Sequence, residues 1–504
     1  MLLQLSFEGD PELDSAGVPT LAHVLKSEIQ RQLGAIVFGG VAMSRPFATP
    51  PGLPADRLAA LRAGLKAAAA DSAMQADGRQ TGNPVTYVAP EHIAEVMQQA
   101  YSTKPELLPA TAAGAEMSKE DLLMANLKTI RTDVVGSLLR PPGLREERIR
   151  FDEGELSAEA LHAIEDEAVR GAVRLQESVG LDVISDGEVR RLNFQDSFGA
   201  AVEGFDANRS TIKSNERRVE GSAPGQRWEI KEMHNTGTAV SHRRPVKARL
   251  KLARNVPLEE YQFVAKVAKA PAKVSLIGPD RISQRFDYEN SRGVYQGLDD
   301  FVDDVVRIER TIVESLVQAG CRYIHIDAPG FTAYVDKPTV EQMKARGEDP
   351  MENFSRSLKA ESRVVENLGD VASGIHLCRG NQRSMWHREG TYDAIAERLF
   401  NELAHDRFLL EYDTPRAGSF EPLRFVPEGK VVVLGLVSTK TSEMETVDGL
   451  KRRIDEAAKF IPLEQLAISP QCGFASDVVG NLISADDQKR KLELVVETAR
   501  QVWG

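Results

Sequence analysis

The stretch "LDDFVDDVVRIERTIVESLVQAGCRYIHIDAP", residues 298–329, decides the fold of this chain. Its first part, 298–320, repeats apolar residues at intervals of three and four, which predicts a long amphipathic helix. Its second part, 322–329, is a short run rich in β-branched and aromatic residues, which predicts a buried strand. Long helices that alternate with short buried strands are typical of α/β proteins with a parallel sheet.

The same alternation extends over the C-terminal three quarters of the chain. Strands are predicted at "IRTDVVGS" (130–137), "DVISDGE" (182–188), "AKVSLIGP" (272–279), "RYIHIDAP" (322–329), "SGIHLC" (373–378), "RFLLEYD" (407–413), "KVVVLGLVS" (430–438) and "QLAISPQC" (465–472). Eight such strands with intervening helices predict a (β/α)8 TIM barrel. A doubly wound open sheet is the alternative, but the chain has no glycine-rich phosphate loop. The segment 218–246 fits neither pattern and is expected to be an inserted hairpin or long loop.

Residues 1–117 have a different character, rich in Ala and Pro. The segment "PADRLAALRAGLKAAAAD" predicts a helix with Leu58, Leu61 and Leu65 on one face, so we expect a mostly helical N-terminal appendage. The pieces "DPEL…VPTL", "RPFATPPGLPADRLAALR" and "YSTKPELL" resemble the C-terminal tail of substrate-binding proteins of tripartite tricarboxylate transporters. This resemblance implies a truncated solute-binding-protein-like segment over 1–117. A linker, "PATAAGAEMSKED", then leads into a barrel domain over 118–504.

Composition narrows the classes of function. The 504 residues carry a net charge of −12, which argues against a general nucleic-acid or membrane-surface partner. No apolar run reaches the roughly 18 residues of a membrane-spanning helix. Three cysteines are too few for a disulfide framework, so a reducing, cytoplasmic location is expected.

Chemically active side chains recur where the predicted strands end. Catalytic groups of TIM barrels collect at the C-terminal ends of the strands. His376 and Cys378 stand two residues apart and would point to the same side of one strand. Zinc accepts imidazole, thiolate and carboxylate ligands, which predicts a metal site if these two meet Glu411 and Cys472. The alternative is a packed strand end in which the cysteine serves as a small apolar residue. Cys321 begins a strand and is expected to be structural.

The segments around these residues resemble a known family. "IHLC", "FLLEYD" and "ISPQCGF" are similar to the zinc-binding segments of cobalamin-independent methionine synthase, in the catalytic barrel that this enzyme shares with uroporphyrinogen decarboxylase. The resemblance covers roughly residues 127–504. It implies that His376, Cys378, Glu411 and Cys472 are zinc ligands. The implied activity is zinc-dependent transfer of a methyl group to the thiol of homocysteine, which forms methionine; zinc makes the thiol a nucleophile.

The resemblance also implies substrate contacts. "VVGSLLRP" corresponds to the segment whose backbone, here near Gly136 and Ser137, holds the carboxylate of homocysteine. "SDGEVRRLNFQDSF" and "YIHIDAP" correspond to segments with carboxylates for its amino group, here Glu188 and Asp327. Asp327 is also a catalytic candidate. His325, two residues before it, is a hypothetical general acid, with a hydrogen-bonded core histidine as the alternative.

The methyl-donor side departs from the family. Arg285 stands near the place of the tryptophan that stacks on methyltetrahydrofolate, and Ala328 follows Asp327 where the family has acidic residues. The family has a catalytic histidine after its seventh strand, whereas the segment "LGLVSTKTSE" offers Val437, Ser438 and Thr439 there and no histidine. The donor is therefore open: a corrinoid, a partner protein or another small alkyl compound are alternatives to the folate. Another acceptor thiol and a metal-free, decarboxylase-like enzyme also stay open.

The loop "RGNQRSMWH" follows Cys378 and carries Arg379, Arg383 and His387. We expect this loop at the barrel mouth. Its cations could bind an anionic group of the donor, although solvated surface charges are the alternative.

Overall fold

The computed structural model describes residues 53–80, 130–194, 196–205, 224–227 and 245–504, with a few isolated positions before residue 91. The chain divides into two units, Met1–Glu120 and Asp121–Gly504. Each unit is described by itself.

In the first unit, the described residues form two helices, α4 (Ala55–Ala69) and α5 (Ser72–Gln80). The helix predicted from the leucine spacing is therefore present as α4. Leu61 and Leu65 on this helix are exposed. The predicted linker 109–121 lies outside the described residues. The resemblance to solute-binding proteins stays a prediction.

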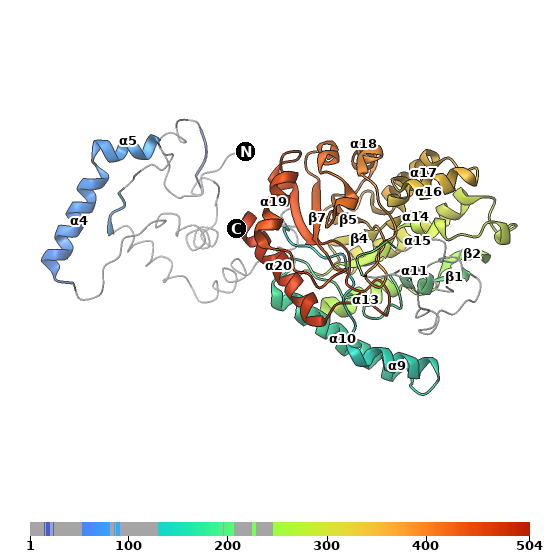
Figure 1. The fold of residues 1–504 in the computed structure, drawn as a ribbon. Coiled ribbons are helices and arrows are strands. Elements are labelled where there is room, and N and C mark those ends of the chain that lie inside the picture. Colours follow the sequence, from blue (N-terminus) through green and yellow to red (C-terminus); the bar gives the residue numbers. More distant parts are fainter. Residues whose placement is uncertain are drawn as a thin grey trace. The chain divides into compact units, whose positions relative to one another are not determined.

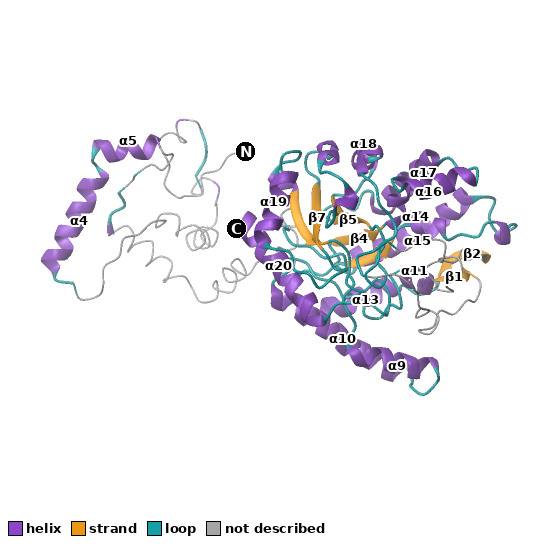
Figure 2. Cartoon of the chain, viewed as in Figure 1, coloured by secondary structure: helices purple, strands orange, loops and turns teal. Residues whose placement is uncertain are grey.

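The second unit is built around a parallel sheet whose strands follow one another in chain order, β3 to β8 (Figure 1). The strands are β3 (Val274–Ile277), β4 (Tyr323–Asp327), β5 (Ala372–Leu377), β6 (Arg407–Glu411), β7 (Val431–Val437) and β8 (Leu466–Pro470). Every residue of these strands is buried, which is typical of a sheet covered on both faces. Figure 2 shows the strands inside this unit with helices around them.

Two further segments extend this sheet toward a closed barrel. Thr132 forms a parallel bridge with Ile468 of β8, and Ile184 forms one with Ala272, just before β3. The fold is the predicted (β/α)8 TIM barrel. Its first two strands, however, are reduced to these single bridges within the described residues.

Hydrogen bonds that involve side chains join these two segments in place of a regular backbone ladder. Asp182 accepts hydrogen bonds from the backbone N–H groups of Arg131 and Thr132, both at 2.9 Å, and its own N–H donates to the Thr132 hydroxyl. Gly187 and Glu188 have positive φ angles of 72° and 51°, which interrupt an extended strand. The predicted strands 130–137 and 182–188 are thus present as irregular segments because polar side chains and left-handed backbone replace the regular ladder.

Long helices alternate with these strands. The helices are α9 (Pro142–Asp152), α10 (Ala158–Val179), α11 (Asp196–Ala201), α13 (Val256–Val267), α14 (Pro279–Gln284), α15 (Leu298–Gln318), α16 (Lys337–Ala345), α17 (Pro350–Val365), α18 (Ala396–Glu402), α19 (Val447–Ala457) and α20 (Ala485–Trp503). The helix expected at 298–320 is α15. It buries Phe301, Val305, Ile308 and Ile312, which recur every three or four residues, and it begins with two aspartates that favour a helix N-terminus.

An antiparallel ribbon lies outside the barrel sheet. It consists of β1 (Val202–Phe205) and β2 (Val246–Leu252). The insert expected at 218–246 lies between these strands and is described only at 224–227 and 245–246. There Gly225 and Arg227 contact the loop after β5: Trp386 donates from its indole N–H to the Gly225 carbonyl at 3.0 Å.

A buried ionic cluster links the first segment of the barrel to its neighbours. Lys273 Nζ lies 2.6 Å from Asp133 Oδ1, and the Tyr323 hydroxyl donates to Asp133 Oδ2 at 2.7 Å. Burial alone would raise the pKa of Asp133, but Lys273 and Arg407 outweigh it and hold that pKa below its usual range. Removing one partner of such a buried pair is expected to cost about 3–5 kcal/mol, because the other charge would be left buried and unpaired.

Among the described helices, none is both long enough and apolar enough to cross a membrane. The cytoplasmic location and the absence of a nucleic-acid partner stay predictions.

Candidate active site

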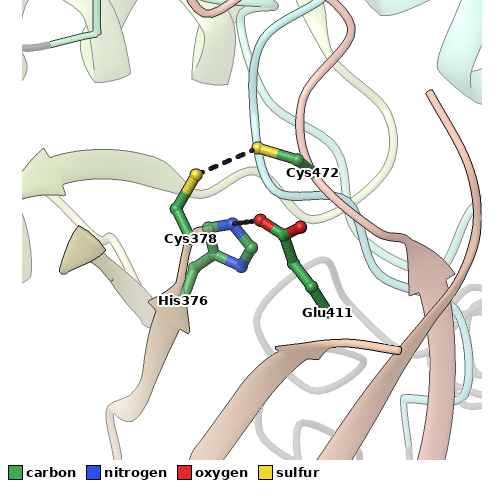
Figure 3. A group of neighbouring side chains, drawn as sticks. All are labelled: His376, Cys378, Glu411 and Cys472. Carbon is green, nitrogen blue, oxygen red and sulfur yellow. Dashed lines mark hydrogen bonds and ion pairs between the residues drawn. The ribbon is translucent and has the colours of Figure 1, made fainter. Parts of the chain in front are cut away.

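Four side chains converge at the C-terminal ends of three barrel strands. His376 lies in β5, Cys378 directly follows that strand, Glu411 ends β6, and Cys472 follows β8 by two residues. One ligand atom from each lies within 4.8 Å of the others, and all four residues are buried. Figure 3 shows both thiols, the imidazole and the carboxylate pointing toward one another.

The spacing fits a zinc ion. Tetrahedral zinc with bonds of about 2.0–2.3 Å separates its ligand atoms by about 3.3–3.8 Å. The sulfur atoms of Cys378 and Cys472 are 3.6 Å apart, and His376 Nε2 lies 3.9 Å from Glu411 Oε1. Cys378 and Cys472 are free thiols. His376 Nε2 is buried and has no hydrogen-bond partner in the part of the chain that the structure describes, as expected for a nitrogen that binds a metal.

Outer contacts fix the orientation of these side chains. His376 Nδ1 donates to the Leu409 carbonyl at 3.2 Å, which leaves Nε2 as the nitrogen facing the cluster. Glu411 accepts from the Arg379 backbone N–H at 2.6 Å and from the Arg416 guanidinium at 2.7 Å. Such partners hold metal ligands in place and tune their basicity.

The charged groups around His376 and Glu411 favour a positive charge at the centre of the cluster. Burial would raise the pKa of Glu411, but Lys440, Arg416 and His376 lower it to about 2. Burial would lower the pKa of His376, but Cys378, Asp327 and Glu411 raise it to about 9. In the absence of a metal the imidazole thus takes up a proton, which is the positive charge that a metal ion would supply.

Two further carboxylates lie near this cluster. Burial raises the pKa of Glu188 to about 6 despite Arg191, and burial raises the pKa of Asp327 to about 6. Glu188 Oε2 and Asp327 Oδ1 are buried and have no hydrogen-bond partner among the described residues. Arg191 approaches Glu188 only to 3.7 Å, because it pairs mainly with Glu260 at 2.6 Å. The two carboxylates thus keep bonding capacity for a cationic ligand.

Gly136 and Ser137 border the same region. A Cβ atom at Gly136 would lie 2.6 Å from Glu188 Oε1, so only glycine lets this backbone approach the carboxylate. Ser137 is buried; its hydroxyl accepts from the Ala475 N–H at 3.3 Å, in the loop that carries Cys472. The structure therefore brings Gly136, Ser137 and Glu188 together, as the sequence predicts; their binding roles stay predictions.

His325 precedes Asp327 by two residues on β4 and so lies further from the C-terminal end of that strand. Its neighbours across the sheet are Ser275 and Gly374, whereas Asp327 pairs with His376. Its Nδ1 is 3.3 Å from Lys273 Nζ, and burial together with Lys273 holds its pKa well below the usual range. The imidazole is therefore neutral. The hypothesis that His325 is a general acid stays untested.

Several cations near the cluster escaped sequence reasoning. Lys440 is buried, and its Nζ donates to Asn381 Oδ1 at 3.1 Å. It follows β7 closely, so the rule that located Glu411 would have found it. Arg416 follows Glu411 by five residues. Arg379, considered from the sequence either as a ligand of the donor or as a solvated loop charge, is instead fully buried, with its guanidinium 4.5 Å from the centre of the Tyr392 ring.

A cavity of about 160 Å³ opens beside Cys378, one of the candidate metal ligands. Its lining includes Asp327, Cys378, His387, Asn381 and Asp477. Arg281 and Arg388 also line it. Any molecule in this cavity would lie next to one of the candidate metal ligands.

Comparison with known proteins shows which family this fold belongs to. Residues 130–240 and 241–500 match the family described as "Cobalamin-independent synthase, Catalytic domain". This chain belongs to that family. Its members are methyltransferases of the methionine synthase type, so the second unit is the catalytic domain of an enzyme family. Because the family is cobalamin-independent, the corrinoid donor weighed from the sequence is not supported.

Individual relatives support this family assignment. The Bacillus subtilis protein YxjH, described as uncharacterized, is 35% identical over 378 residues, which cover 74% of this chain and 94% of YxjH. The methionine synthase of Saccharolobus solfataricus is 24% identical over 380 residues, 75% of this chain and 96% of that enzyme.

Solved structures show the same barrel. A Listeria monocytogenes protein, provisionally described as a vitamin-B12-independent methionine synthase, superposes with a TM-score of 0.55 at 25% identity, over 74% of this chain and 97% of that one. A B12-independent methionine synthase from Shewanella, solved with selenomethionine, has a TM-score of 0.54 at 20% identity over the same shares.

Proposed function

We propose that this chain is a zinc-dependent S-methyltransferase that transfers a methyl group to the thiol of homocysteine and forms methionine. One observation carries the proposal: the cluster of His376, Cys378, Glu411 and Cys472 lies near two buried carboxylates that have unpartnered oxygens. The first group suits a metal that binds sulfur. The second suits an ammonium group on the same substrate.

Zinc at this cluster would lower the pKa of a substrate thiol and keep its sulfur as the nucleophilic thiolate. The chain's own residues would hold the metal ligands in place and orient the substrate. Arg416 and the Arg379 N–H hold Glu411 in place, while the Leu409 carbonyl fixes the imidazole tautomer. Glu188 and Asp327 would bind the ammonium group through charge-assisted hydrogen bonds and so orient the thiol.

Relatives support the choice of acceptor. The Shewanella enzyme was solved with selenomethionine, the selenium analogue of methionine. A site that holds this amino acid needs partners for its ammonium and its carboxylate. In this chain the candidates are Glu188 and Asp327 for the ammonium and the backbone near Gly136 and Ser137 for the carboxylate.

X-ray absorption at the zinc edge, on the zinc-loaded full-length chain, tests the proposal without needing a donor. Two sulfur and two lighter ligands are expected in the resting protein, and homocysteine should add a third sulfur. Homoserine, which replaces the thiol by a hydroxyl, is the matched control and should leave the sulfur count unchanged. Zinc ligation that does not respond to homocysteine would indicate a closed structural site instead.

The metal-free, decarboxylase-like alternative is addressed by a chelator. Methionine formation should stop when a strong chelator removes zinc and return when zinc is restored. Activity that survives full zinc removal would favour the metal-free alternative.

A further inference from the structure

A buried lysine follows β7 at the end of the barrel that carries the candidate metal ligands. Lys440 comes three residues after this strand ends, and its exposed fraction is only 1%. Its Nζ donates a hydrogen bond to Asn381 Oδ1 at 3.1 Å. Among the described residues Lys440 forms no ion pair, because Glu411 pairs with Arg416 instead, at 2.7 Å. Lys440 is therefore a buried cation whose bonded neighbour is a neutral amide.

The charge of this lysine acts on the candidate metal cluster. A buried ammonium group without a counter-charge costs solvation free energy, and negative charge nearby offsets that cost. Burial would raise the pKa of Glu411, but the surrounding cations lower it to about 2, and Lys440 is the strongest of them, ahead of Arg416. The two groups thus interact through space although they are not hydrogen-bonded to each other.

One contact joins Lys440 to both segments that carry the candidate thiolates. Its partner Asn381 follows Cys378 by three residues. The Asn381 amide group in turn donates to the carbonyl of Gly473 at 2.6 Å, directly after Cys472. The position of the ammonium group is therefore coupled to both sulfur ligands through a single asparagine.

Neighbouring residues anchor this arrangement further. Thr439, which precedes the lysine, donates from its backbone N–H and its hydroxyl to Gln471 Oε1, at 2.7 and 2.8 Å, just before Cys472. The Asn481 amide donates to Asn381 Oδ1 at 3.0 Å and to the Thr439 carbonyl at 2.9 Å. All these polar side chains are buried. The network holds the lysine beside the cluster instead of letting it turn to solvent.

The charges of the cluster show what this cation can offset. With zinc bound, two thiolates and the Glu411 carboxylate would carry one negative charge more than the metal, and a substrate thiolate would add another. Arg416 also lies beside Glu411, but it is shared with a second carboxylate, Asp413, at 2.6 Å. Lys440 has no such second partner among the described residues. Its charge is therefore available to a substrate thiolate.

We propose that Lys440 makes the site prefer the charged acceptor thiolate to the uncharged thioether product. This inference rests on the proposed function, because it needs a thiolate bound at the metal. A positive charge close by favours the charged form of an acidic group, and its effect is strong where water is excluded. Lys440 is thus a specificity residue that acts on the sulfur through its charge.

The charge on the acceptor sulfur changes during methyl transfer. The thiolate sulfur gives an electron pair to the transferred carbon, and the bond between that carbon and the donor's leaving atom breaks, with its electron pair staying on the leaving atom. The sulfur of methionine is neutral. The product therefore lacks the attraction to Lys440 that the acceptor had, which favours its release.

Calorimetric titration of homocysteine and of methionine into the zinc-loaded full-length chain tests this without turnover. Lys440→Met replaces the ammonium group by an apolar side chain of similar length. It should weaken homocysteine binding by about tenfold or more and change methionine binding by less than about twofold, since only the thiolate carries the charge. Zinc content should stay at about one per chain, because Lys440 is not among the candidate ligands. A merely structural role would weaken the binding of both ligands alike.

Two further variants sharpen the result. Lys440→Arg keeps the positive charge and should restore most of the preference for homocysteine. Lys430→Met is the matched control, because Lys430 precedes β7 at the opposite end of the strand and donates to the Phe400 carbonyl at 3.3 Å. This control should leave both affinities unchanged. Near-ultraviolet circular dichroism shows whether each variant is folded; if Lys440→Met is not, Lys440→Gln, whose amide can still donate to Asn381, decides.

The possible outcomes separate this inference from the proposed function. If the natural chain binds homocysteine, but Lys440→Met weakens both ligands equally or neither of them, the inference is overturned and the proposed function stands. If the natural chain binds zinc but not homocysteine, the proposed function is refuted and the inference falls with it. A selective loss of homocysteine affinity that Lys440→Arg restores supports both.

Discussion

His376 and Glu411 belong to regular strands, whereas Arg281 and Arg388 lie on a six-residue helix and a folded loop at the same barrel mouth. The first pair belongs to the proposed thiol-activating half, and the second lines the cavity beside it. Strand ends are fixed by hydrogen bonds to both neighbouring strands, and loops can change without disturbing the sheet. The sequence accordingly predicts that the thiol half keeps the family pattern and that the donor half departs from it.

The largest effect is expected where the thiol half loses a ligand. Cys378→Ser should lower zinc affinity well beyond the roughly 10–100-fold typical of losing an outer contact, and methyl transfer should be lost with it. Zinc titration against a competing chelator measures this. A Cys378→Ser variant that binds zinc with unchanged affinity would contradict the proposal that Cys378 is a zinc ligand of the thiol half.

Asp327→Asn should raise the KM for homocysteine by about 10–100-fold, because an amide cannot provide the charge that the ammonium requires. Its zinc content should stay unchanged, since Asp327 is not among the candidate ligands. Steady-state kinetics with elemental analysis separates the two effects. Loss of zinc from this variant would place Asp327 in the metal cluster instead.

Acceptor affinity should depend on pH through Glu188, whose pKa is raised to about 6 mainly by burial. Arg191 and Arg140 lower this pKa, while Asp186 and Asp327 raise it. The ammonium needs both carboxylates ionised, and the pKa of Asp327 is also raised to about 6 by burial, so affinity should be full well above pH 6 and fall by up to about a hundredfold per pH unit below it. Homocysteine binding followed by calorimetry between pH 5 and 8 tests this, with Glu188→Gln as the control that should keep only the shallower step due to Asp327.

The smallest effect is expected from the first unit. Removing residues 1–117 should leave zinc content, kcat and thermal stability of the barrel nearly unchanged, because Asp121–Gly504 forms its own compact unit. Assays on the shortened chain check this. A large loss of activity would mean that the appendage takes part in the function.

Much of the fold could be predicted because helix and strand periods alternate so regularly around α15 and β4. The first two strands were overestimated, since Asp182, Gly187 and Glu188 replace ladder hydrogen bonds by side-chain contacts and turns. The spacing of apolar residues along the sequence does not reveal where side chains compete with the backbone for hydrogen bonds.

The gathering of His376, Cys378, Glu411 and Cys472 could be anticipated because strand ends meet at one rim, so only the order of the strands is needed. That these residues bind zinc stays a prediction. The place of Arg388 beside the cavity could not be anticipated. Arg388 reaches the cavity only through the return of its loop onto the Arg379 carbonyl. Arg379 itself turns to Tyr392 instead of the mouth.

The most direct test is the zinc content of the purified full-length chain and of Cys472→Ser, measured by elemental analysis. Cys321→Ala is the control, because Cys321 is buried and donates to the Tyr323 carbonyl at 3.3 Å, outside the cluster. About one zinc per chain is expected in the natural sequence and in Cys321→Ala, and little or none in Cys472→Ser. A chain that holds no zinc after growth in zinc, or a Cys472→Ser variant that keeps it, would contradict the account.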